Sequence, residues 1–424
     1  MPTLTPALNR NKSSIRNAPE MKPSRNALIG RLEWVSEIAF LAAIFILPFS
    51  KAALEVFLSV AFAFWFVTKI IRNRPLCERQ GLFILLGLYI VISSISAFES
   101  GYPIVAARGI LKLVRYSFIT LMALDFYRDP KRLNRLGLVF FASIGVLALD
   151  SLAQGLWGKD LIARLPLQYA DAQARITGPF RSYGLLAGLL ISSLPIMCAL
   201  GFGKLKISRW SRAGLFLLIP VAFYLLYKTH SRGAWIAVFG AWLVFGFLVR
   251  QKIVIFIVLS AIVAVPFLLP RNALIHLDMN QQEQSVIERY YLWDRASQVI
   301  KKKPWFGCGI NTYSRNYPRL DETKSWRVPG YQVHNGYLQV AAETGIISLA
   351  LFLALLWRGL SAGFASLKKA APRQKLLIGG VISGFVALLF QAMVDTTFQS
   401  IQSAVLVWFR MGLLLSANDA VGEA

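Results

Sequence analysis

Residues 234–269 read AWIAVFGAWLVFGFLVRQKIVIFIVLSAIVAVPFLL, which is two long apolar runs separated by Arg250-Gln251-Lys252. Neither run, Ala234–Val249 or Ile253–Leu269, contains a charged side chain. Apolar helices of about this length can cross a bilayer, because a helix satisfies its own backbone hydrogen bonds inside hydrocarbon. The stretch therefore predicts a close hairpin of two membrane-spanning helices.

The composition extends this prediction to the whole chain. Of 424 residues, 56% are hydrophobic and only 16% are charged, which is too apolar for a soluble protein of this length. Similar runs recur from Phe40 to Leu414. We therefore predict an all-α integral membrane protein with about twelve transmembrane helices and a large helical external loop.

The predicted loop is the longest polar interruption between the apolar runs. Within it, Leu292, Ala296, Val299 and Ile300 fall at helical spacing, which predicts an external helix over Ser285–Lys303. The predicted division is 1–33 as a cytoplasmic basic tail, 34–270 as the first nine transmembrane helices, 271–345 as the loop, 346–416 as the last three helices, and 417–424 as a cytoplasmic tail.

The distribution of Lys and Arg predicts the orientation. These residues concentrate in 128–135, 204–212 and 368–375, and are absent from 99–103 and 395–400. Cytoplasmic loops collect Lys and Arg, so both termini are expected inside and residues 271–345 outside.

The net charge of +25, from 46 Lys+Arg against 21 Asp+Glu, would suggest nucleic acid in a soluble protein. Here membrane topology accounts for much of it, and no nucleic-acid partner is expected. Orientation does not explain the ten Lys and Arg residues from Arg271 to Arg327, on the external side. An anionic ligand would explain them.

Two arginines are candidates for phosphate binding. Arg232 follows Ser231 at the external start of a span, where a helix N-terminus and a guanidinium together suit phosphate oxygens. The alternative is an interfacial anchor with Ser231 as a helix N-cap. Arg289 precedes Tyr291 and Trp293 in the external loop, and an amphipathic helix resting on the bilayer would have the same pattern. Two guanidiniums on one face would clamp a pyrophosphate.

The candidate catalytic residue is His334, which with Asn335 ends the loop just before a span. A lone histidine is more often structural. The position of His334 on the same side of the membrane as both arginines favours a role as a general base. The external segments hold no paired-carboxylate motif, and the three cysteines have no metal or disulfide spacing, so we expect no metal and no cofactor.

One further group lies inside a predicted span. Arg108, Lys112 and Arg115 share one helical face. Charges within a span are costly and usually functional, although a span boundary misplaced by one turn would put some of them at the interface. A flippase or transporter of an anionic lipid, the alternative from a different class, would use this stripe.

The candidate residues stand in order with two more motifs. The order is Ser231-Arg232-Gly233, Arg289 with Leu292-Trp293, Pro304-Trp305-Phe306-Gly307-Cys308-Gly309, His334-Asn335 and Glu343-Thr344-Gly345. This combination resembles the O-antigen ligase and polymerase family of bacterial envelope glycosyltransferases, over roughly residues 178–355 of the chain.

The resemblance implies metal-independent, inverting transfer of a glycan from undecaprenyl pyrophosphate, at the periplasmic face of the inner membrane. It implies that Arg232 and Arg289 bind the pyrophosphate and that His334 activates the acceptor. Arg181, in Gly178-Pro179-Phe180-Arg181, matches another family motif, which usually continues with a Pro or Asn pair where this chain has Ser182-Tyr183-Gly184.

Within the family, ligase is the first expectation, with lipid A-core as the acceptor. Polymerases tend to have two sizeable external loops, and protein O-oligosaccharyltransferases are generally longer at the C-terminus. Both stay open as alternatives. The oligomeric state is not determined by the sequence.

Overall fold

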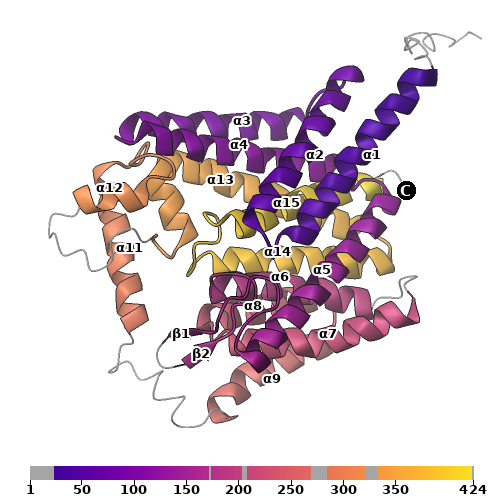
Figure 1. The fold of residues 1–424 in the computed structure, drawn as a ribbon, viewed down its shortest axis with the longest axis vertical. Coiled ribbons are helices and arrows are strands. Elements are labelled where there is room, and N and C mark those ends of the chain that lie inside the picture. The colour runs from indigo at the N-terminus through magenta and orange to yellow at the C-terminus, as the bar shows by residue number, and fades with distance from the viewer. Residues whose placement is uncertain (1–22, 171–172, 203–207, 269–283, 321–331, 423–424) are drawn as a thin grey trace, which may run out of the picture.

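A computed structural model describes residues 23–170, 173–202, 208–268, 284–320 and 332–422. Most of the chain forms long helices that run side by side, and α11 and α12 lie together at one end of the bundle (Figure 1). The first 22 residues of the predicted tail, residues 269–270 of the predicted ninth span, and residues 271–283 and 321–331 of the predicted loop lie outside the described residues.

The elements follow each other in a simple order. The helices are α1 Pro23–Ile46, α2 Lys51–Ile71, α3 Gln80–Ile95, α4 Pro103–Phe126, α5 Pro130–Trp157, α6 Tyr183–Phe202, α7 Arg209–Lys228, α8 Arg232–Leu248, α9 Lys252–Leu268, α11 Gln284–Lys302, α12 Tyr313–Leu320, α13 Gly336–Lys369, α14 Pro372–Gln391 and α15 Ile401–Gly422. A 3-10 helix spans Ser96–Glu99, and β1 Gln168–Ala170 pairs antiparallel with β2 Gln173–Arg175.

The chain is an all-α, multi-pass membrane protein. Eight helices in the described ranges are long and apolar enough to cross a bilayer, and α8 is a shorter apolar helix. α4 is as long, but it contains three basic residues and is not among the eight. The count of about twelve spans therefore stays a prediction.

The first helix begins earlier than the apolar pattern suggests. The predicted tail, residues 1–33, overlaps this helix, because α1 starts at Pro23 and buries Ile29. Its acidic residues are paired, since Arg72 lies 3.0 Å from Glu33 and Arg135 lies 3.1 Å from Glu37. These ion pairs tie α1 to the C-cap of α2 and to α5.

A break in α13 separates the loop from the bundle. Gly345 has φ 84° and ψ 172°, so a short helix from Gly336 to Thr344 precedes the longer part that ends at Lys369. A Cβ at Gly345 would lie 1.9 Å from the carbonyl oxygen of Trp305. The predicted start of a span at Ile346 coincides with this break.

Replacing Gly345 with alanine should destabilise the protein by about 3 kcal/mol or more, because the new Cβ meets both a left-handed backbone and the Trp305 carbonyl. The measurement is thermal unfolding of the purified protein in detergent. Gly30→Ala is the matched control, since no atom lies within 4 Å of its Cβ position. Equal melting temperatures for the two variants would contradict the prediction.

Candidate functional site

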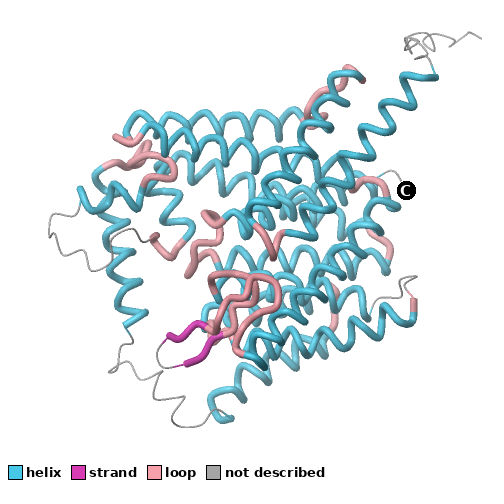
Figure 2. Tube along the Cα trace, in the orientation of Figure 1, coloured by secondary structure: helices cyan, strands magenta, loops and turns pink. Residues whose placement is uncertain are grey.

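The turn between α14 and α15, residues 392–400, is the point at which the candidate motifs meet. The backbone N–H of Gly336 donates to the carbonyl of Ala392 at 2.7 Å. A Cβ built on Gly233 would lie 2.5 Å from a methyl group of Val394. Several loop segments lie toward the end of the bundle that carries α11 and α12, and others lie at the opposite end (Figure 2). We call residues 392–400 the site turn.

The site turn places a carboxylate next to the predicted base. Asp395 Oδ1 lies 3.9 Å from His334 Nδ1, and both side chains are half-buried, at 29% and 35% exposed. Burial raises the pKa of Asp395, but His334, the backbone N–H of Thr396 and the charge of Arg289 lower it by more, to below its usual value. Asp395 is therefore ionised at neutral pH and faces the imidazole.

Gln391 holds this carboxylate. Its Nε2 donates to Asp395 Oδ2 at 3.3 Å and to the carbonyl of Gly184 at 2.9 Å, and its side chain is buried. A side chain at Gly184 would collide with this carboxylate, because a Cβ there would lie 2.5 Å from Asp395 Oδ2. The first turn of α6 is thereby joined to the site turn.

Two predicted arginines flank the same turn. Arg181 lies three residues before Gly184, is exposed, and its carbonyl accepts from Gln168 Nε2 at 3.1 Å. Arg232 is the first residue of α8, is also exposed, and precedes Gly233. Ser231 occupies the N-cap position, but its side chain makes no capping hydrogen bond. The structure thus brings the starts of α6 and α8 to one place.

The third predicted arginine approaches from the loop. Arg289 lies in α11, is half-buried, and its charge acts on the Asp395 carboxylate. Trp293 packs against a small second core that includes Ala296 and Val333, so it anchors α11. The guanidinium of Arg295 stacks over Tyr291 at 5.1 Å. Tyr291 and Trp293 therefore support the helix that carries Arg289.

Asn335 has a structural role. Its Oδ1 accepts from the backbone N–H groups of Tyr337 and Leu338, both at 3.1 Å, which caps α13. His334, directly before it, adopts a left-handed backbone with φ 52°. The cap therefore positions the backbone next to His334, from which the imidazole projects.

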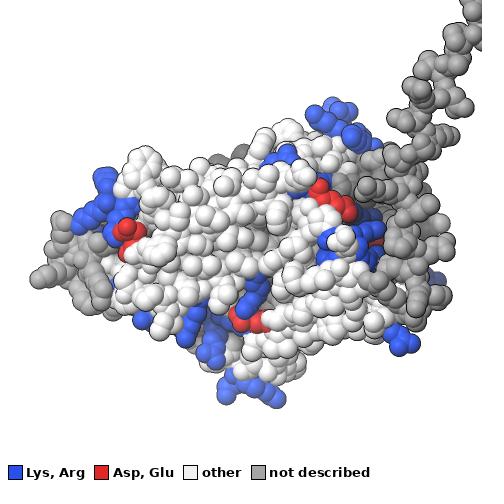
Figure 3. Space-filling view, turned by 90° about the horizontal axis from the view of Figure 1, so that it is seen from above, with Lys and Arg blue, Asp and Glu red and all other residues white. Residues whose placement is uncertain are grey.

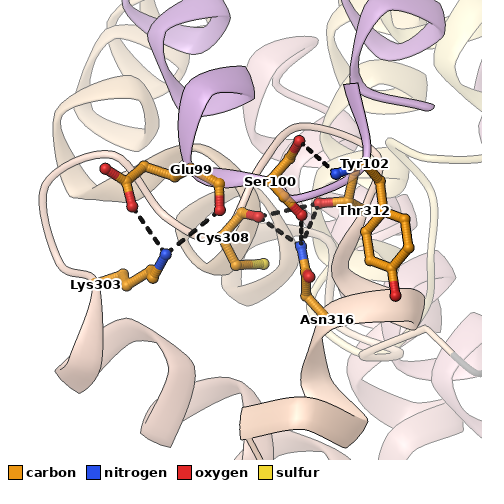
Figure 4. Close-up of polar contacts among 7 residues, drawn as sticks. All are labelled: Glu99, Ser100, Tyr102, Lys303, Cys308, Thr312 and Asn316. Atoms are coloured by element: carbon orange, nitrogen blue, oxygen red, sulfur yellow. Dashed lines mark hydrogen bonds and ion pairs between the residues drawn. The ribbon is translucent and has the colours of Figure 1, made fainter. Parts of the chain in front are cut away.

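The glycine-rich loop motif has no chemistry of its own. The N–H of Cys308 donates to Ala342 and that of Gly309 to Glu343, both at 2.9 Å. Burial raises the pKa of the Cys308 thiol to about 12, so this sulfur is unreactive. Lys303 binds Glu99, and Asn316 donates to the carbonyls of Ser100 and Cys308 (Figure 4). These contacts fasten the loop to the bundle.

The sequence analysis missed Asp395 and Gln391. Both residues follow an apolar run. The sequence signal for Asp395 was an acidic residue in a turn that has no Lys or Arg, and Gln391 had no such signal. In the described ranges, no group of three or more His, Cys, Asp and Glu side chains gathers in a way that could hold a metal ion.

Comparison with known protein families gives a match within the chain. A family model described as O-antigen ligase matches residues 213–353. The match runs from α7 into α13, so it includes Arg232, Arg289 and His334 and leaves out Arg181 and Asp395. No curated protein matches the chain.

Proposed function

The chain carries an O-antigen ligase family domain at residues 213–353, and from this premise we propose that it transfers a glycan from undecaprenyl pyrophosphate to a sugar hydroxyl of lipid A-core in lipopolysaccharide biosynthesis. The observation that carries the proposal is the pairing of His334 with Asp395, 3.9 Å apart, at the turn flanked by the starts of α6 and α8. The arrangement combines a base with cationic groups, as glycosyl transfer from a pyrophosphate requires.

In the proposed reaction, His334 takes the proton from the acceptor hydroxyl. The hydroxyl oxygen attacks the anomeric carbon from the face opposite the pyrophosphate, so the configuration inverts. The bond from the anomeric carbon to the pyrophosphate oxygen breaks, and that oxygen keeps the electron pair. Asp395, ionised beside Nδ1, orients the imidazole and stabilises its protonated form.

The arginines act on the leaving group. Arg232 and Arg289, with Arg181 as a further candidate, offset the negative charge that develops on the pyrophosphate oxygens. This assignment gives the transfer a metal-independent route with no cofactor. The positive end of the α8 dipole adds to the charge of Arg232, which lies in its first turn.

The proposed location is the bacterial inner membrane. The site turn would lie at the periplasmic face and both termini in the cytoplasm, as the distribution of Lys and Arg predicts. The lipid tail of the donor would lie in the bilayer beside the helices.

Reconstitution of the purified protein with lipid-linked donor tests the function. Separate reactions contain lipid A-core, a second donor molecule or a serine-rich peptide as the acceptor. Glycosylated lipid A-core is the expected product. Elongated donor would instead indicate the polymerase, and glycosylated peptide the protein O-oligosaccharyltransferase. Movement of donor across the bilayer with the glycan still on its carrier would indicate the flippase.

Replacing Asp395 with asparagine should lower turnover by about tenfold to a hundredfold, with little change in the donor KM, because the group acts through His334. Steady-state kinetics from pH 5 to 9 measure both. An equally large rise in the donor KM would indicate a structural role only.

A further inference from the structure

The basic stripe of α4 lies on the surface near the loop. Arg115 Nη1 pairs with Glu55 Oε2 of α2 at 3.1 Å, and Lys112 Nζ lies 3.5 Å from Asn311 Oδ1. Arg108 is exposed, and no described residue forms a hydrogen bond or ion pair with it. Arg115 is thus ion-paired and the charge of Lys112 acts on the buried Glu343, whereas Arg108 has no ionic partner among the described residues.

A fourth basic residue joins the stripe from α2. The pairs Glu55–Arg115 and Lys69–Asp125 follow the same order along both helices, so α2 and α4 run parallel. Lys51 lies one turn before Glu55 and is therefore on the Lys112 side of Arg115. It is exposed and, among the described residues, has no ionic partner. We call Lys51, Arg108 and Lys112 the α4 basic surface.

The surroundings of the α4 basic surface are aliphatic. Ile104 and Leu111 of α4 are 70% and 64% exposed, and Val56 of α2 is 60% exposed. Seen from above, Lys and Arg lie in separate groups, with a few Asp and Glu beside them, on a face that is mostly uncharged (Figure 3). A ligand that satisfies both features needs an anionic group next to hydrocarbon, which is the chemistry of a lipid phosphate.

A chain of contacts connects this surface to the proposed base. Lys112 approaches Asn311, whose N–H donates to Glu343 Oε2 at 2.8 Å. Gln339 Nε2 donates to Glu343 Oε1 at 3.1 Å, and the N–H of Val333 donates to Gln339 Oε1 at 3.2 Å. Val333 directly precedes His334. The surface and the site therefore belong to the same end of the bundle.

We propose that the α4 basic surface binds an anionic phosphate at the lipid end of the acceptor glycolipid, while the sugar of that glycolipid reaches His334. The inference rests on the proposed function. Transfer between two lipid-anchored molecules needs two lipid sites, and the pyrophosphate of the donor is already assigned to Arg232 and Arg289. Lys51 and Arg108, which have no ionic partner among the described residues, would supply the second site together with Lys112.

The test is the acceptor dependence of transfer by the Arg108→Gln/Lys112→Gln double variant in proteoliposomes. Its acceptor KM should rise about tenfold or more, the factor for losing one charge-assisted hydrogen bond. Turnover at saturating acceptor and the donor KM should stay within about twofold. The matched control, Arg74→Gln/Arg250→Gln, removes two exposed charges that follow the far ends of α2 and α8, and it should behave like the wild type.

A dephosphorylated acceptor separates the sources of phosphate. The wild type's KM for the dephosphorylated acceptor should equal the double variant's KM for the phosphorylated acceptor. The double variant should have the same KM for both acceptors. An unchanged acceptor KM in the double variant would overturn the inference. So would a rise that disappears when phosphatidylglycerol in the vesicles is replaced by phosphatidylcholine, because ordinary bilayer lipid would then be the occupant. Absence of transfer by the wild type to any acceptor would instead contradict the proposed function.

Discussion

Replacing His334 with glutamine is expected to lower turnover by about a hundredfold to ten-thousandfold, the contribution of a positioned general base. Glutamine retains hydrogen-bonding capacity and a similar size, so the cap at Asn335 and the approach to Asp395 stay possible. The donor KM should change little, because the imidazole acts on the acceptor hydroxyl. Single-turnover transfer with preloaded donor measures the chemical step directly.

His230→Gln is the control for this prediction. His230 also has a left-handed backbone, and its ring packs against Tyr227 at 5.8 Å, but the proposed mechanism gives it no role. Its turnover should stay within about twofold of the wild type. A large loss in His230→Gln together with near-normal transfer by His334→Gln would reverse the assignment of the base.

Replacing Arg289 with glutamine is expected to lower kcat/KM for the donor by about a hundredfold to a thousandfold, the usual loss when one charge-stabilising group is removed. Arg289→Lys should recover part of the rate, because lysine keeps the charge and lacks the guanidinium fork. The measurement is transfer at limiting donor, with folding checked by thermal unfolding.

Arg295→Gln is the matched control on the same helix. Arg295 pairs with Asp294 at 2.7 Å and stacks over Tyr291, so its loss removes a local contact of α11. Pairs with an exposed partner contribute little, and kcat/KM should fall by less than about fivefold. Equal losses in the two variants would indicate that Arg289 only stabilises α11.

Much of the membrane architecture follows from the sequence. The predicted spans Ala234–Val249 and Ile253–Leu269 differ from α8 and α9 by at most two residues at each end. The predicted external helix Ser285–Lys303 differs from α11 by one. A long apolar run has few alternatives to a helix in a bilayer, so pattern alone determines such elements.

Local polar contacts were harder to predict. Glu33 and Glu37 of α1 pair with Arg72, which follows α2, and with Arg135 of α5. The β1–β2 hairpin follows a turn in which Asp150 accepts from the N–H groups of Leu161 and Ile162, both at 2.9 Å. Neither has a periodic signal, because the partners are far apart or irregularly spaced.

The sequence by itself determined the class of protein, most helix positions and the residue types of the candidate site, since bilayer length, helical periodicity and family motifs are all local patterns. Only the tertiary structure decided that Asp395 faces His334, because 61 residues separate them and no spacing rule relates a loop to a later turn. It also decided that Gly184 and Gly233 pack against the same turn. Convergence of distant segments depends on helix packing, and a chemical site of this kind exists only after that packing has formed.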